Sequence, residues 1–245
     1  MIFLTPRLLL RPFDPSTDAP TLLLWKNSPT FRQYLDLGPE KPVDRDANLA
    51  FVKKLATVTP EGFPAFAVCE RPATAAEEPD NALKGVEDLF VDKEGRSRYP
   101  IIGILITRGK DWSFTTRCAV VSVVLQPSHC STPCPLSRPS PSTSISLFFP
   151  TSHLLLLLCA DNGLGTELMT WACDYLFNTL NVHRIELGAD SRNLRAIRCY
   201  EKVGFVKEGV RRKSFFKGGV WIDAVDMGIL EEEFRGKWPV TGQVN

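Results

Sequence analysis

The sequence is poor in the residues that build metal centres and disulfide frameworks. Among 245 residues it has three histidines and three methionines, and its seven cysteines form no Cys-x-x-Cys pair. A zinc cluster and a disulfide framework are therefore not expected. Buried or free thiols in a reducing compartment are the simpler interpretation, and we predict a cytoplasmic protein with no metal site.

An excess of charge of one sign is also missing. The chain has 29 basic and 28 acidic residues, which gives a formal net charge of +1. No overall electric field then favours nucleic acid or an anionic membrane, so neither is expected as a partner. The opening residues, MIFLTPRLLLRPF, lack a long apolar run followed by a small-residue cleavage site. A secretory signal is not expected either.

Residues 130–160 lack both charge and any helical or alternating pattern. Arg138 is their only charged residue, and Ser, Pro, Leu, Thr and Phe dominate the composition. Their run of five leucines is too short to span a bilayer, and a structureless loop of this length is unusual between two elements. Because Ser, Pro, Leu and Phe have pyrimidine-rich codons, we interpret 130–160 as a disordered insert from a retained intron or a gene-model error.

The remaining sequence alternates between strand and helix patterns. β-branched and apolar runs of strand length predict strands, and apolar residues recurring every three or four positions predict helices. Residues 71–98, rich in Ala, Pro, Glu, Asp and Gly, are predicted to form a mobile loop. We therefore expect a single domain over 1–245 with an α/β (α+β) fold, a mixed sheet flanked by helices. Strands are predicted at 8–11, 63–69, 101–107, 119–125, 184–188, 205–209 and 220–230, and helices at 14–25, 44–57, 166–180 and 193–203.

Two motifs in the second half of the chain carry a functional signal. With 130–160 set aside, the strand that ends at Leu125 leads into Gly163-Leu-Gly165 at the start of a helix. Glycines let backbone N–H groups approach a phosphate, and the helix N-terminus adds positive partial charge. A short Gly-x-Gly is equally typical of an ordinary turn. One strand downstream, however, comes Asn193-x-x-Ala-x-x-x-Tyr200-x-x-x-Gly-Phe.

Together, the two motifs resemble the signature of the GNAT superfamily of N-acetyltransferases. The opening TPRLLLRPF and the closing WIDAVDMGILEEEF are similar to the ends of its RimJ/RimL-like branch, so the resemblance covers about residues 4–234 apart from 71–98 and 130–160. It implies a GNAT fold, with a mostly antiparallel, twisted central sheet. It also implies an acyltransferase that moves an acetyl group from acetyl-CoA directly to a primary amine, either a protein N-terminus or a small amine.

The resemblance also implies a cofactor site made largely of backbone. In the family the pantetheine arm pairs with a splayed strand, and a glycine loop holds the pyrophosphate. Asn193 matches a residue that contacts the cofactor arm or an ordered water, although asparagine is equally suited to cap the helix that follows it. The residues that correspond to the cofactor site here are Val123, Leu125, Gly163, Leu164, Gly165, Thr166 and Asn193.

Two side chains are candidates for proton transfer. Tyr200 matches the family tyrosine that protonates the departing thiolate, but a tyrosine on a helix can equally be a core residue. Glu186 is the candidate base for the acceptor amine, and strand alternation places it opposite the packed face; a solvated, unpaired glutamate is the alternative. Asp223 and Asp226 are candidates for recognising a cationic substrate, or are simply solvated.

The sequence departs from the family pattern at one informative position. Ala160 stands three residues before Gly163, where the family has Gln or Arg. If 130–160 is genuine, it lies where the pyrophosphate should bind, and a non-catalytic GNAT protein becomes the alternative function. A dinucleotide-dependent dehydrogenase fits less well, because Leu168 stands where the third glycine of its motif is required. Acetyl-CoA and an amine are the expected partners of a monomer or homodimer.

Overall fold

The computed structural model describes residues 2–28, 42–57, 64–71, 101–110, 118–125 and 163–239, with the backbone alone described at 108–110 and 118–125. These residues form one eight-stranded sheet with the order β1-β2-β3-β4-β5-β6-β8-β7. Every neighbouring pair of strands is antiparallel except β5 and β6, which are parallel. The strands are β1 (Phe3–Leu4), β2 (Leu8–Arg11), β3 (Ala65–Glu70), β4 (Ile101–Lys110), β5 (Cys118–Leu125), β6 (Arg184–Asp190), β7 (Val206–Lys217) and β8 (Val220–Leu230).

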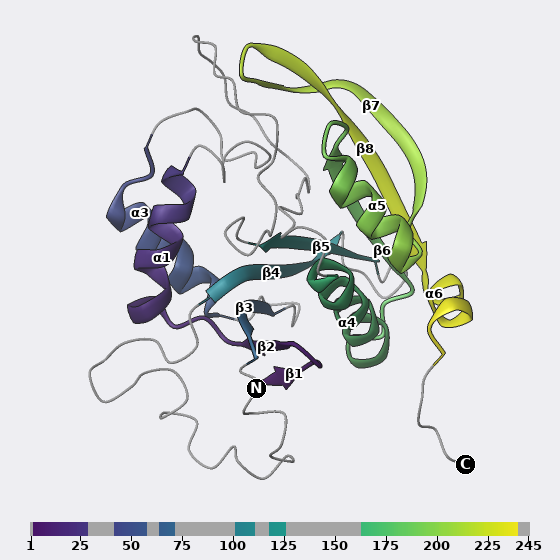
Figure 1. Ribbon diagram of the computed structural model, residues 1–245, viewed down its shortest axis with the longest axis horizontal. Coiled ribbons are helices and arrows are strands. Elements are labelled where there is room, and N and C mark those ends of the chain that lie inside the picture. The colour runs from purple at the N-terminus through teal and green to yellow at the C-terminus, as the bar shows by residue number, and fades with distance from the viewer. Residues whose placement is uncertain are drawn as a thin grey trace.

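Helices cover both faces of this sheet (Figure 1). Asp14 and Asp44 start the first two helices, since their carboxylates accept the N–H of Ser16 at 2.9 Å and of Ala47 at 2.8 Å. Such caps satisfy N–H groups that have no partner within the helix. The helices are α1 (Pro15–Asn27), α3 (Arg45–Leu55), α4 (Leu164–Thr179), α5 (Leu194–Val203) and α6 (Glu231–Lys237).

The sheet separates two apolar clusters. Successive residues of a strand point to opposite faces, so in β2 Leu8 and Leu10 pack under α4 and α5, whereas Leu9 packs under α1 and α3. A buried ion pair joins β2 to α1, because the Arg11 guanidinium donates to both oxygens of Asp18 at 2.7 and 2.8 Å. Burial next to this pair raises the pKa of the Cys69 thiol to about 11, as expected for an unreactive cysteine.

The structure departs from the sequence-based expectation in three places. The predicted end of the strand at residue 209 is wrong, because β7 continues to Lys217 and the chain turns at Gly218 and Gly219, which have φ of 57° and 80°. Register shifts within β7 interrupt the alternation of its side chains between the two faces, so the sequence shows no regular strand pattern beyond residue 209. The helix expected at 166 begins at Leu164. Neither β1 nor α6 was predicted, since two residues and seven residues are too short for a periodic signal.

The fold class itself is as predicted: a mixed, mostly antiparallel sheet with helices on both faces. Of the cysteines in the described part of the chain whose side chains are resolved, Cys69, Cys173 and Cys199 are buried free thiols, as expected. No helix among the described residues has the length and apolar character needed to cross a membrane. The predicted single domain over 1–245 stays a prediction.

Candidate functional site

The parallel strands β5 and β6 separate soon after they meet. They pair from Cys118 opposite Arg184 to Val120 opposite Glu186, and then β5 continues to Leu125 and β6 to Asp190 without a shared register. The two strands therefore form a V whose inner edges carry backbone N–H and C=O groups. Such an edge pairs readily with another extended chain.

The two predicted strand residues of the cofactor site lie in the splayed half of β5. Val123 pairs with Leu105 and Leu125 pairs with Gly103, both in β4 on the far side from β6. One edge of this part of β5 is thus used by the sheet, and the other faces the V. This is the arrangement that strand-like binding of an extended ligand requires.

Gly163 opens α4 in a left-handed conformation. Its φ of 72° and ψ of 2° suit glycine, and its C=O accepts the Glu167 N–H at 3.0 Å. The N–H groups of the first helical turn, including those of Leu164 and Gly165, have no acceptor within the helix and add positive partial charge at this end. Thr166 is close enough to α5 for its Oγ1 to lie 3.5 Å from Cys199 Sγ. These four consecutive residues could hold an anion on backbone amides.

Glu167 anchors the N-terminal strands beside this turn, a role that the sequence did not reveal. Its Oε1 accepts from Thr5 Oγ1 at 2.5 Å and from the Arg7 N–H at 2.9 Å, and its Oε2 accepts from Arg7 Nε at 2.7 Å. Burial alone would raise the pKa of Glu167, but these hydrogen bonds outweigh burial and lower it. Arg7 is so close that a Cβ at Gly163 would lie 3.3 Å from its Nη2.

Asn193 is the N-cap of α5. Its side-chain oxygen accepts the Ala196 N–H at 3.2 Å, and the residue is only 5% exposed. The helix-capping interpretation is therefore observed. Contact with a cofactor stays a prediction for this residue.

Tyr200 lies on the α4/α5 face of the sheet. It is 2% exposed, its ring centroid is 5.9 Å from that of Phe205, and it belongs to the same apolar cluster as Leu187 and Ala189 of β6. Those two β6 residues are beyond the last residue paired with β5. The tyrosine thus occupies a core position on this face of the sheet, and its proton-donating role stays a prediction.

Glu186 lies on the opposite face, at the point of the V. Its neighbours Ile185 and Leu187 are buried in the α4/α5 cluster, so alternation directs Glu186 away from it. The glutamate is not isolated: its Oε1 accepts from Arg184 Nε at 2.9 Å. Arg184 also pairs with Glu208 of β7, and these bonds, chiefly the one to Glu208, raise the pKa of the arginine.

Gly228 of β8 makes room for this charged group. It pairs with Glu186 in the sheet, and a Cβ there would lie 2.6 Å from Glu208 Oε1 and 2.8 Å from Arg184 Nη2. A side chain at 228 would therefore displace both charged groups. The sequence did not reveal this role of Gly228, because Arg184 and Glu208 are remote from it along the chain.

The two aspartates considered for cation recognition are already engaged. Asp226 accepts from Arg211 Nη2 at 2.6 Å and from Arg211 Nε at 2.7 Å. Asp223 accepts the backbone N–H of Lys213 at 2.7 Å. Both interactions link β7 to β8, and the arginine offsets the charge of Asp226.

Several predictions fall on parts of the chain that the structure does not describe. Residues 72–98 of the expected loop and the whole of 130–160, with Ala160, lie outside the described residues. The predictions for these segments are untested. Among the residues that are described, no group of three or more His, Cys, Asp and Glu side chains could hold a metal ion.

In comparison with known sequences, the segment that contains both motifs matches one family. Residues 159–205 match the Acetyltransferase (GNAT) family. The chain is 45% identical to a probable N-acetyltransferase, YjcK, of Bacillus subtilis over 76 residues. These aligned residues make up 30% of this chain and 42% of that protein. The chain is 35% identical to spermidine N(1)-acetyltransferase of Escherichia coli over 81 residues, which make up 33% of this chain and 44% of that protein. The chain matches less than half the length of these relatives.

Solved structures share the fold over nearly the whole chain. Spermidine N-acetyltransferase from Vibrio cholerae, in complex with CoA and spermine, has a TM-score of 0.61 and 19% identity, covering 94% of this chain and 99% of that one. Ribosomal-protein-S5-alanine acetyltransferase from Vibrio fischeri has a TM-score of 0.62 and 16% identity, covering 96% and 98%. The chain therefore has the GNAT fold, and the sequence match to the GNAT acetyltransferase family covers residues 159–205.

Proposed function

We propose that this protein transfers an acetyl group from acetyl-CoA directly to a primary amine. The observation that carries the proposal is that the protein has two features together: the V between β5 and β6, and the left-handed Gly163 that starts α4. The first offers a strand edge for an extended arm, and the second offers backbone amides for a diphosphate. The overall fold is shared with the acetyltransferases that this chain is similar to, which supports the proposal.

The residues present fit coenzyme A. Val123 and Leu125 would hold the pantetheine arm through their backbone, and Gly163, Leu164, Gly165 and Thr166 would hold the pyrophosphate. Acetyl-CoA supplies an activated thioester carbonyl. Backbone N–H groups of β5 that face the V would then donate to that carbonyl oxygen as negative charge develops on it.

Glu186 and Tyr200 divide the proton transfers between the two faces of the sheet. Glu186 accepts the proton that the amine loses on attack, directly or through a water, and Arg184 fixes the position of its carboxylate. Tyr200 donates its phenolic proton to the sulfur as the carbon–sulfur bond breaks. The proton on Glu186 later returns to solvent and Tyr200 is reprotonated, so the protein ends unchanged.

The acceptor is a protein N-terminus or a small amine. The relatives support both classes, since one is named for spermidine and one for the alanine of a ribosomal protein. The RimJ/RimL-like branch is the assignment that the terminal sequences favour. We place the reaction in the cytoplasm, in a monomer or homodimer.

A transfer assay tests the proposal. Purified protein is mixed with acetyl-CoA and a panel of amines that includes spermidine, a peptide with a free N-terminus and an aminoglycoside, and released thiol is measured. Amine-dependent release supports acetyl transfer. Saturable binding of acetyl-CoA without release for any amine would instead favour the non-catalytic alternative, to which the 37 residues between Leu125 and Gly163 give some weight.

A further inference from the structure

The β7–β8 hairpin extends past the end of the sheet. β6 ends at Asp190, which pairs with Ala224, and the next residue, Ser191, donates its N–H to the Asp223 carbonyl at 3.0 Å. Beyond that point β8 pairs with β7 alone, as far as Val220 opposite Lys217. Figure 1 shows this projecting end at the top of the view, past α5.

The projection continues in the direction in which the V opens. β6 runs from the point of the V at Glu186 toward Asp190, and the hairpin extends the same line. Trp221 is seven residues along β8 from Gly228, the partner of Glu186, which is about 23 Å at the usual rise of a strand. The end of the hairpin is therefore remote from the reacting groups but lies beyond the open side of the V.

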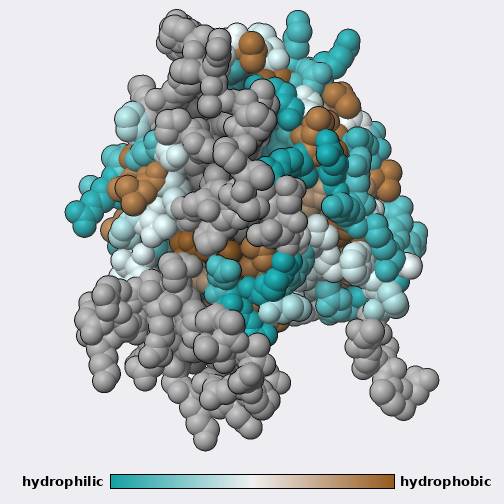
Figure 2. All heavy atoms as spheres, viewed as in Figure 1, coloured by the Kyte–Doolittle hydropathy of each residue, from teal (hydrophilic) through white to brown (hydrophobic). Residues whose placement is uncertain are grey.

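Large apolar side chains are exposed at this end. Trp221 is 59% exposed, Phe216 is 46% exposed, and their ring centroids are 5.3 Å apart. Val220 is exposed next to them. In Figure 2 hydrophobic residues lie beside hydrophilic ones along the upper edge of the molecule, where the hairpin ends. Exposed tryptophan within such a patch is typical of an interaction surface.

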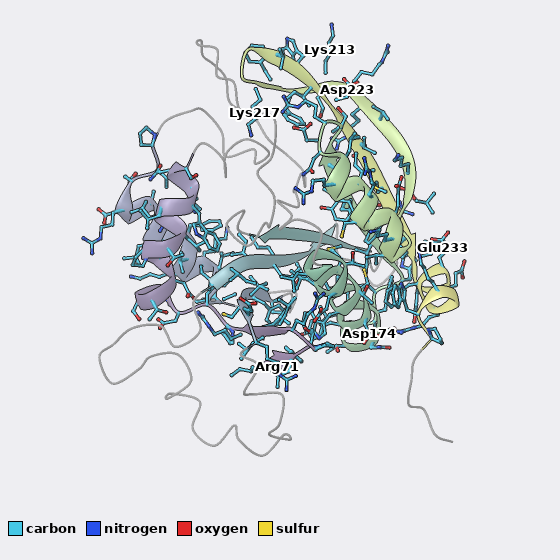
Figure 3. All side chains as sticks on the ribbon, in the orientation of Figure 1. Arg71, Asp174, Lys213, Lys217, Asp223 and Glu233 are labelled. Carbon is cyan, nitrogen blue, oxygen red and sulfur yellow. The ribbon has the colours of Figure 1, made fainter. Side chains whose placement is uncertain are left out.

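Positive charge surrounds the aromatic pair. Residues 211–226 carry four basic and two acidic side chains, a net charge of +2. The acidic ones, Asp223 and Asp226, are held by the Lys213 amide and by the Arg211 guanidinium. Arg212 and Lys213 are exposed, and Figure 3 shows Lys213, Asp223 and Lys217 together at the end of the hairpin.

We propose that the end of the hairpin, residues 212–221, binds an acidic segment of a peptide or protein acceptor whose amine enters the V. This inference rests on the proposed function and chooses a substrate class for it. An extended peptide of about seven residues spans the distance from Trp221 to the level of Glu186. The aromatic pair packs on apolar side chains of the segment, and Arg212 and Lys213 attract its carboxylates.

The same charge disfavours a polyamine as the acceptor. Like charges placed opposite each other exclude wrong partners and slow their approach. The methylene spacers of a polyamine are short, so packing them on the aromatic pair would bring its ammonium groups next to Arg212 and Lys213. The preferred substrate therefore differs in charge from spermidine, the acceptor named for one of the sequence relatives.

The test compares acceptors that share the amine and differ in a distant segment. Three ten-residue peptides have the same first four residues and carry acidic, neutral or basic residues at positions five to eight; a tripeptide and spermidine complete the set. We expect kcat/KM for the acidic peptide to exceed that for the basic one by about tenfold. Arg212→Glu/Lys213→Glu should remove this difference, and Trp221→Ala should raise KM for the long peptides alone.

A matched control separates local attraction from overall charge. Lys53→Glu/Lys54→Glu makes the same change in charge on two exposed residues of α3 and should leave the peptide preference intact. Equal kcat/KM for the three peptides, or efficient acetylation of spermidine, would overturn the inference while leaving acetyl transfer in place. Loss of a dimer in Trp221→Ala, seen by sedimentation, would overturn it in favour of a contact between two copies. Failure to bind acetyl-CoA would remove the proposed function itself.

Discussion

The carboxylate of Glu186 accepts a hydrogen bond from Arg184 at 2.9 Å, at the last position where β5 and β6 pair. The arginine is shared with Glu208 of β7, so one cation holds two carboxylates. Of the two carboxylates, only Glu186 belongs to a strand that borders the V. Glu186 is therefore the catalytic candidate, and Glu208 is a matched control that binds the same arginine.

Glu186→Gln is expected to lower kcat/KM by at least about 100-fold, because an amide cannot accept the proton of the acceptor amine. Glu208→Gln should cost much less, since it removes a partner of Arg184 without touching the proposed base. Steady-state rates against pH for both variants provide the measurement. Equal losses in the two variants would mean that the charged group is structural.

Tyr200→Phe keeps the buried ring and removes only the hydroxyl. We expect kcat to fall by about 100-fold or more with little change in KM, because proton donation to the leaving sulfur is lost. Tyr175→Phe, in the aromatic group that α4 makes with Phe3 and Phe66, is the control and should retain activity. The role assigned to Tyr200 is wrong if the two substitutions have the same effect on kcat.

Gly163→Ala should weaken both stability and cofactor binding. A left-handed φ costs a residue with a Cβ about 1–2 kcal/mol, and the new Cβ would lie 3.3 Å from Arg7 Nη2. Gly218→Ala carries the same backbone strain, with φ of 57°, but no atom lies within 4 Å of its Cβ. Calorimetric titration with CoA should show a loss of affinity for the first variant and none for the second. A similar affinity in both would disconnect Gly163 from the phosphate.

Glu167→Gln should destabilise the protein in a manner that depends on pH. Hydrogen bonds to a charged group contribute about 1.5–3 kcal/mol, and those from Thr5 and Arg7 give the folded state a lower pKa for Glu167 than its ordinary 4.5. The stability from this group is present above pH 4.5 and is lost as the pH falls through the folded-state value. Urea unfolding of both proteins at pH 7 and below pH 4 should give curves that converge on acidification; a constant difference would contradict this.

The elements that sequence predicted best are those with a local signal. A clear apolar pattern or a helix cap marks three of them: β2 at Leu8–Arg11, β6 from Arg184, and α5, which ends at Val203. The two motifs also placed Gly163 and Asn193 at the starts of helices, where the structure has them. A motif that spans only a few residues predicts structure correctly when local backbone preferences decide that structure.

The parts that sequence missed depend on contacts between distant segments. Glu167 is 160 residues from Arg7, and Glu208 meets Arg184 only because β7 and β6 flank β8. No period or spacing encodes such pairs. The length of β7 was missed for a related reason: its register shifts break the alternation, and pairing with β8 holds it extended. Tertiary context decides these positions rather than propensity.

Binding of acetyl-CoA is the measurement that tests the account most directly. Thermal unfolding is followed during titration with acetyl-CoA, for the complete chain and for a variant that lacks residues 130–160. A ligand that binds only the folded state must raise the apparent stability, by about 2.7 kcal/mol at a hundred times its Kd. The account predicts a saturable increase in Tm for the shortened variant at least. No increase for either protein would contradict the assignment of the V and the Gly163 turn as a cofactor site.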